Sequence, residues 1–176
     1  GVDTILGPEM KSTGEVMGVG KTFGEAFVKS QMGAGVLLPE QGKVFLSVKN
    51  NDKTRAVAVA KELVAMGYSL CATRGTAAAL EAAGMAVQAV NKVAEGRPHI
   101  VDMIKNGEIA MVINTVEERR NAIADSRQIR TSALLARVTT FTTIFGAEAA
   151  VEGMKAMRGN LDVHSVQELH AMLTKA

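Results

Sequence analysis

Short apolar segments alternate with helical segments along most of this sequence, and this alternation restricts the possible folds more than any other feature. Runs rich in Val, Ile, Leu and Phe predict five strands, at residues 43–48, 68–72, 85–90, 109–114 and 138–141. Helices are predicted between them at residues 53–66, 76–83, 99–105 and 126–136. Successive strands joined through helices form right-handed crossovers and pair in parallel. The sequence therefore predicts an α/β domain whose five-stranded parallel sheet is covered on both faces.

Further helices are predicted outside the alternation, at residues 21–32, 143–157 and 165–173. Glycines and a proline between Gly33 and Gly42 predict a linker before the first strand. In the helix at 53–66, one expected apolar face consists of Val57, Ala60, Leu63 and Val64.

A hydroxyl, amide or ammonium group follows every predicted strand. These groups belong to Ser47 and Lys53, Thr73 and Thr76, Asn91 and Lys92, Asn114 and Thr115, and Thr142 and Thr143. In open parallel sheets, ligands bind beyond the carboxyl ends of the strands. Lys53 and Lys92 would neutralise a phosphate, while the Asn114 amide suits a ribose or a base edge.

Residues 70–77 carry the strongest local indication of such a site. A strand turns directly into a helix there, so the first helical N–H groups lack partners and the helix dipole adds positive charge. Thr73 and Thr76 contribute hydroxyls, Gly75 permits close approach of the backbone, and Arg74 brings a charge. These features suit a phosphate. The alternative is that Thr76 acts only as a helix N-cap.

The composition of the chain and its short motifs exclude several classes of function. A net charge of +2 gives no argument for nucleic acid binding, and the apolar runs are too short to span a membrane, so a cytoplasmic protein is expected. The single cysteine, Cys71, is expected to be buried in a strand. Neither a dinucleotide or phosphate-loop motif nor zinc-ligand spacing is present. Asp102 and Asp125 are assigned to helix surfaces or caps, which leaves no predicted catalytic or metal-binding residue.

Three stretches resemble the large subunit of carbamoyl phosphate synthetase. Residues 6–18, LGPEMKSTGEVMG, resemble the end of its second ATP-grasp unit, whereas 91–100, NKVAEGRPHI, and 125–130, DSRQIR, resemble its C-terminal regulatory domain. The resemblance implies a C-terminal piece of a bacterial large subunit. It assigns residues 1–32 to the tail of the carbamoyl phosphate ATP-grasp unit, 33–42 to a linker and 43–176 to a methylglyoxal-synthase-like allosteric domain. The implied fold is a Rossmann-like or flavodoxin-like three-layer domain.

In that family this domain binds UMP as an inhibitor and IMP as an activator. The positions that match the nucleotide site are Ser47, Lys53, Thr73, Thr76, Lys92 and Asn114. The resemblance implies that the lysines and threonines hold the phosphate and that Asn114 faces the ribose or base. Val116 stands where a further hydroxyl is expected.

The resemblance also implies an ornithine site, for which Leu6 and Thr142 match, although Thr140-Phe141 stands in place of the expected Tyr-Asp. The implied partners are the remainder of the large subunit and the glutaminase small subunit. The full enzyme is a ligase of pyrimidine and arginine biosynthesis that makes carbamoyl phosphate with ATP and Mg²⁺ or Mn²⁺. The fragment alone is expected to hold no cofactor and no catalytic site.

Two other functions remain as alternatives. The first is a methylglyoxal synthase, a phospho-elimination lyase, which would need a carboxylate base in a Gly-Gly-Asp-type segment after the third strand. Asn91-Lys92-Val93-Ala94-Glu95 occupies that place. The second is a purely structural oligomerisation domain.

Overall fold

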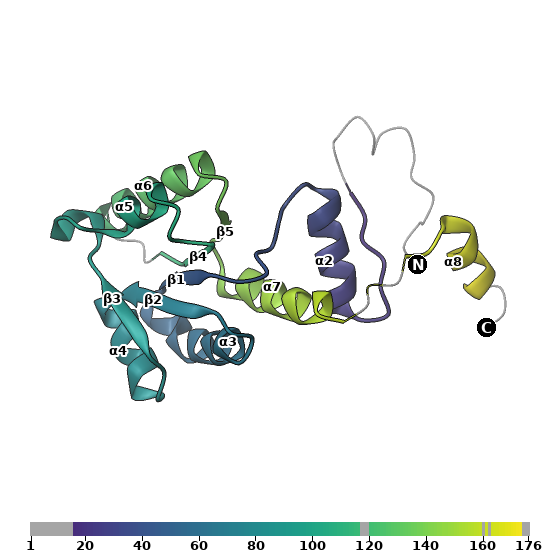
Figure 1. Cartoon of the computed structure of the whole chain (residues 1–176), viewed down its shortest axis with the longest axis horizontal. Helices are drawn as coiled ribbons and strands as arrows, with labels where there is room; N and C mark the ends of the chain where they lie inside the picture. Colours follow the sequence, from purple (N-terminus) through teal and green to yellow (C-terminus); the bar gives the residue numbers. More distant parts are fainter. Residues whose placement is uncertain (1–15, 117–119, 160, 162, 174–176) are drawn as a thin grey trace.

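Five parallel strands form the central sheet in the computed structural model, which describes residues 16–116, 120–159, 161 and 163–173. The strands are β1 (Lys43–Ser47), β2 (Ser69–Thr73), β3 (Val87–Val90), β4 (Met111–Asn114) and β5 (Thr139–Phe141). Their order is β3-β2-β1-β4-β5, and every neighbouring pair is parallel. This order is that of the Rossmann fold, with the switch point between β1 and β4. The predicted α/β fold with a five-stranded parallel sheet is confirmed (Figure 1).

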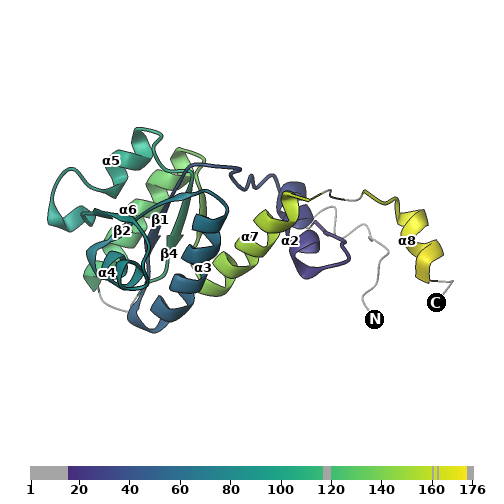
Figure 2. The same cartoon turned by 60° about the horizontal axis from the view of Figure 1, so that its bottom comes forward.

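Helices cover both faces of the sheet, so the domain has three layers (Figures 1 and 2). One layer contains α3 (Lys53–Ala65), α4 (Arg74–Ala82) and α7 (Ile144–Met157), and the opposite layer contains α5 (Ile100–Lys105) and α6 (Arg120–Leu135). Two short 3-10 helices, η1 (Asn50–Asp52) and η2 (Val93–Glu95), follow β1 and β3. Both lie in the segments that leave the carboxyl ends of these strands.

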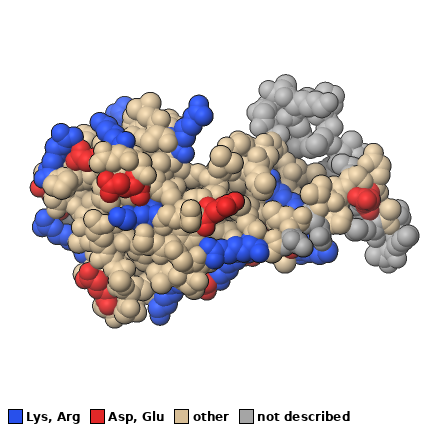
Figure 3. Space-filling view, viewed as in Figure 1, with Lys and Arg blue, Asp and Glu red and all other residues tan. Residues whose placement is uncertain are grey.

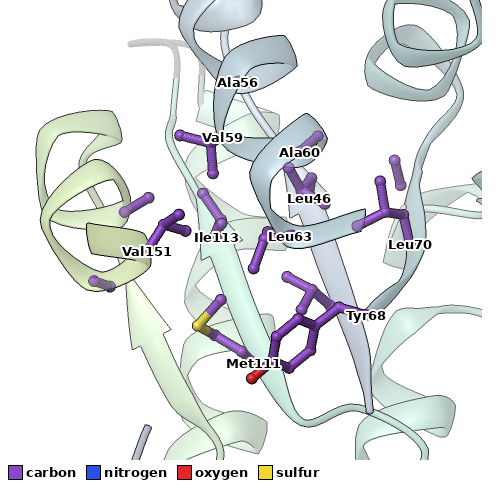
Figure 4. Packing of buried hydrophobic residues seen from close by; sticks show 14 of the residues in the cluster. Leu46, Ala56, Val59, Ala60, Leu63, Tyr68, Leu70, Met111, Ile113 and Val151 are labelled. Atoms are coloured by element: carbon purple, nitrogen blue, oxygen red, sulfur yellow. The ribbon is translucent and has the colours of Figure 1, made fainter. Parts of the chain in front are cut away.

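Alternate residues of β1 supply the two cores. Val44 and Leu46 are fully buried against the layer of α3, α4 and α7, while Phe45 is fully buried against α5 and α6. Figure 4 shows Leu46 and Ile113 of the sheet beneath α3, with Val151 of α7 beside them. A strand buried on both faces must be apolar throughout, which explains its continuous hydrophobic sequence.

Two helix boundaries and one helix face differ from the predictions. α4 begins at Arg74 rather than Thr76, and α6 begins at Arg120 rather than Ser126. The buried face of α3 consists of Ala56, Val59, Ala60 and Leu63, whereas Val64 is 43% exposed. Val57 is half-buried and packs against the same core, so only the prediction that Val64 belongs to this face was wrong.

α2 (Phe23–Gly33) packs on α7 beyond the sheet, and the two helices lie side by side in Figures 1 and 2. Gly24 and Gly153 make this approach possible. A Cβ on Gly24 would lie 2.9 Å from the Glu152 carbonyl oxygen, and one on Gly153 would lie 3.3 Å from Val28 Cβ. Residues 34–42 then connect α2 to β1, and α8 (Val166–Leu173) is the final described helix.

Charged residues of both signs share the surface. On the face drawn in Figure 3, described lysines and arginines are interspersed with aspartates and glutamates over the domain. None of the described helices is long and apolar enough to cross a membrane.

Cys71 is expected to resist alkylation while the protein is folded. It is fully buried in β2, and burial raises the pKa of its thiol to about 12. The thiolate that reacts with iodoacetamide is therefore scarce near pH 8. Mass spectrometry should find negligible labelling of the native chain and complete labelling in urea. Fast labelling without denaturant would contradict the burial of this strand.

Candidate functional site

A polar cavity of about 220 Å³ lies at the carboxyl ends of β1, β2 and β4. This is the switch point of the sheet, where Ser47 of β1 is paired with Asn114 of β4. The structure brings all the predicted nucleotide-site residues together in its lining, namely Ser47, Lys53, Thr73, Thr76, Lys92 and Asn114. Their role in binding stays a prediction.

Three hydroxyl groups in the lining of this cavity lie close to one another. Thr76 Oγ1 accepts a hydrogen bond from the backbone N–H of Val48 at 3.1 Å. Thr73 Oγ1 lies 3.4 Å from Thr76 Oγ1 and 3.3 Å from Ser47 Oγ. Because the Thr76 oxygen already accepts from a backbone donor, its own O–H is available to donate to a ligand.

The N-cap role considered for Thr76 was wrong. Thr73 occupies the cap position of α4, and its side chain makes no capping hydrogen bond. Thr76 lies in the first turn of the helix, where it is 2% exposed. The first N–H groups of α4, with the helix dipole, are therefore directed at the same cavity as the hydroxyls.

Two lysines add positive charge to this end of the cavity. Lys53 is the first residue of α3, and its Nζ would lie 3.8 Å from a Cβ built on Gly75 in α4. Lys92 reaches the cavity from the segment after β3, where η2 begins. Ammonium groups beside a helix N-terminus make this end suited to a phosphate.

Two hydrogen bonds hold the segment that carries Lys92 in place. Arg74 donates to Asn91 Oδ1 at 2.9 Å, and the backbone N–H of Lys92 donates to Glu95 Oε2 at 2.8 Å. The Glu95 carboxylate, which belongs to the segment where a lyase would need its base, therefore caps its own turn.

Asp102 takes the capping role expected of it. Its carboxylate accepts from the backbone N–H of His99 at 3.0 Å, at the start of α5. The Arg97 guanidinium hydrogen-bonds to the same carboxylate and, together with that N–H, lowers the pKa of Asp102. Asp102 thus contributes to the structure of the loop and does not line the cavity.

The opposite wall of the cavity, on the β4 side, carries an amide, hydroxyls and a carboxylate. Asn114 is 3% exposed, and its Nδ2 donates to Ser126 Oγ of α6 at 2.9 Å. Asp125 lies on α6, half-buried, and the surface of the helix that carries it also lines the cavity. Thr115 lies between the two ends and accepts from the backbone N–H of Lys49 at 3.0 Å.

Thr115, one of the polar residues expected after the strands, also lines the cavity, whereas sequence reasoning missed Ser126 and the position of Asp125 there. Val116, the residue that stands in place of an expected hydroxyl, is at the cavity and lies with Val48 and Ile129 among its apolar lining. The cavity therefore has a cationic end with hydroxyl and N–H donors, an end with an amide, hydroxyls and a carboxylate, and an apolar portion of wall.

The ornithine site stays a prediction, because only one of its two residues is described. Thr142 is exposed after β5 and lines a separate, mainly apolar pocket with Phe141, Leu134 and Leu37. Leu6 lies outside the described residues. Within the described ranges, no group of three or more His, Cys, Asp or Glu side chains is placed to hold a metal ion.

Comparison with known proteins agrees with this architecture. Residues 55–142 match the MGS-like domain family. Proteins named carbamoyl phosphate synthase large chain from Ralstonia nicotianae and Neisseria meningitidis are 65% and 58% identical over 173 residues, and one from Pasteurella multocida is 56% identical. These alignments cover 98% of this chain but 16% of each relative. The chain belongs to the MGS-like domain family.

Proposed function

We propose that this domain is a regulatory module that binds a nucleoside monophosphate in the cavity at the switch point. The observation that carries the proposal is the polarity of the cavity. The hydroxyls of Thr73 and Thr76, the α4 N-terminus and two lysines lie at one end, and the Asn114 amide and Asp125 carboxylate lie at the other. A ligand with an anionic group at one end and hydroxyl or N–H groups at the other suits this cavity.

A nucleoside monophosphate has this distribution of groups. Its phosphate would accept from Thr73, Thr76 and the first N–H groups of α4, with Lys53 and Lys92 neutralising its charge. Its ribose hydroxyls, and the N–H groups of a uracil or hypoxanthine base, suit the end with the amide, hydroxyls and carboxylate. UMP and IMP are therefore the ligands proposed for this cavity.

The regulatory role proposed for nucleotide binding is supported by the relatives, which are named as carbamoyl phosphate synthase large chains. In a glutamine-hydrolysing synthetase of this kind, UMP would inhibit and IMP would activate by binding the domain in different states of the whole enzyme. The size of either effect is limited by the difference in the nucleotide's affinity for those states. ATP, the metal ions and catalysis would belong to the remainder of the large subunit, which works with a glutaminase subunit.

Thermal unfolding tests the binding proposal. UMP or IMP at about 100 times its dissociation constant should raise Tm by about 5 to 10 °C for a chain of this size. Uridine and inosine, which lack the phosphate, are expected to give little or no shift at the same concentrations. Equal stabilisation by uridine and UMP would show that the phosphate is not recognised, and no shift with either nucleotide would contradict the proposal.

A further inference from the structure

Arg74 is the first residue of α4, and it is not part of the cavity lining. The residues on either side of it line the cavity, whereas Arg74 does not. Its side chain is exposed and contacts the neighbouring segment, where Nη2 donates to Asn91 Oδ1 at 2.9 Å. Asn91 directly precedes Lys92, which does line the cavity. The guanidinium that the sequence offers to a phosphate is therefore hydrogen-bonded to the segment that carries another cation.

The partners of Asn91 determine the orientation of its amide. A guanidinium can only donate hydrogen bonds, and a carbonyl oxygen can only accept them. Asn91 Oδ1 accepts from Arg74, and Asn91 Nδ2 donates to the carbonyl oxygen of Pro98 at 3.3 Å. If the amide turned over, its NH₂ group would face the guanidinium and its oxygen would face the carbonyl, so both hydrogen bonds would be lost. One arrangement of the amide therefore satisfies both partners.

Asn91 is also the residue at which the loop carrying Lys92 closes. Its backbone forms an isolated parallel bridge with His99, and its carbonyl oxygen accepts from the Ile100 N–H at 3.4 Å. Residues 92–98 form the loop between these contacts, and Lys92 is its first residue. A movement of Asn91 would therefore move the backbone of Lys92 with it. Arg74 joins this junction to α4, the helix whose N-terminus lies at the cationic end of the cavity.

Lys92 reaches the cavity from the edge of the sheet. It is exposed and follows β3, which is an edge strand. The attraction between two charges falls as their separation grows, and salt screens it further when the charges are exposed. An ammonium group on such a loop therefore contributes to anion binding only while the loop holds it near the anion.

We infer that Arg74 is a positioning residue that acts through Asn91, holding the 92–98 loop so that the Lys92 ammonium lies at the cationic end of the cavity. This inference rests on the proposed function, because it assigns the placement of one cation in the same site. The alternative is that the Arg74 charge acts on the phosphate directly. A direct effect persists when Asn91 or Lys92 is replaced, whereas a positioning effect disappears.

A binding cycle tests this role. Dissociation constants of UMP and inorganic phosphate would be measured for the parent chain, for Arg74→Ala, Asn91→Ala and Lys92→Ala, and for the two double variants that contain Arg74→Ala. Arg74→Ala should weaken both ligands by about threefold to tenfold, the size of one hydrogen bond. In the Asn91→Ala and Lys92→Ala backgrounds, the same change should weaken them by less than about twofold.

Two further variants serve as controls. Arg74→Lys keeps a donor of similar reach and should retain most of the affinity. Arg127→Ala removes one exposed positive charge from α6, at a residue that does not line the cavity, and should leave both constants unchanged. Because Arg74 is exposed, Arg74→Ala should leave the urea midpoint of the ligand-free chain nearly unchanged, so that a loss of affinity does not reflect unfolding.

The outcomes distinguish the inference from the function on which it rests. Failure of the parent chain to bind UMP overturns the proposed function and the inference with it. Binding of UMP to Arg74→Ala at the parent's affinity overturns the inference alone. So does an undiminished loss from Arg74→Ala in either background. Lys92 is exposed, so its background remains measurable even where Asn91→Ala does not fold.

Discussion

Replacing Thr76 by valine is expected to weaken UMP binding by about 10-fold to 100-fold, the largest loss predicted for one neutral side chain in the cavity. Valine has nearly the shape of threonine and lacks only the hydroxyl. Thr76 is 2% exposed and lines the cavity, and its hydroxyl accepts from the Val48 N–H, which leaves its own O–H to donate to the proposed phosphate. A hydrogen bond to a charged group contributes about 1.5–3 kcal/mol, and about 1.4 kcal/mol corresponds to tenfold in affinity.

The same substitution removes the acceptor of the Val48 backbone N–H, so a moderate loss of stability should accompany the loss of affinity. An unpartnered buried donor costs about 1–3 kcal/mol. Thr76→Ser is the matched control because it keeps the hydroxyl and should retain most of the affinity. Binding of UMP to Thr76→Val at the parent's affinity, measured on protein that is still folded, would contradict the placement of the phosphate.

Replacing Phe45 by alanine is expected to lower the free energy of unfolding by about 3–5 kcal/mol, the range found when a buried aromatic side chain leaves a cavity. Phe45 is fully buried in β1 and packs in the core beneath α5 and α6. Its neighbours there include Cys71, Ile104 and Val112, all buried. Domains have only about 5–15 kcal/mol of total stability, so the variant should be marginally stable.

Urea titration of the parent and variant measures this difference. Phe23→Ala is the matched control, since Phe23 is 61% exposed on α2 and its loss should cost about 1 kcal/mol or less. A change of under about 1 kcal/mol for Phe45→Ala would contradict the two-sided burial of β1.

The residues of the cavity that follow β1, β2 and β4 could be predicted because parallel topology determines where they go. Once the alternation indicates a parallel sheet, Ser47, Thr73 and Asn114 must emerge at the same edge. Lys53 begins α3 and Thr76 lies in the first turn of α4, the helices that leave that edge, so their positions follow as well.

Ser126 and Asp125 could not be placed in this way, because they reach the cavity from the helix that covers the sheet. The angle at which α6 crosses the strands depends on tertiary packing. One indication is present in the sequence. Ser126 precedes the buried residues Ile129 and Ala133 by three and seven positions, so it belongs to the buried stripe of the helix. A serine in such a stripe needs a partner, and Asn114 is that partner.

Val64 was placed wrongly on the buried face of α3 for a related reason. The segment from Ala56 to Ala60 alternates alanine and valine, so its hydrophobic residues do not contrast with polar ones at helical spacing. Burial is decided instead by the fit of Ala56 and Ala60 against the sheet, and Val64 is left exposed. The start of α4 was misplaced because Arg74 and Gly75 resemble a turn, whereas the structure makes them the first helical turn.

The central claim is that one cavity binds the phosphate of a nucleotide, and calorimetric titration of the chain with UMP tests it most directly. The titration would be run in a buffer free of phosphate and again with increasing inorganic phosphate. The account predicts saturable binding at one site per chain, with an apparent affinity that falls as phosphate competes. Binding that inorganic phosphate leaves unchanged, or no binding of UMP or IMP at all, would contradict it.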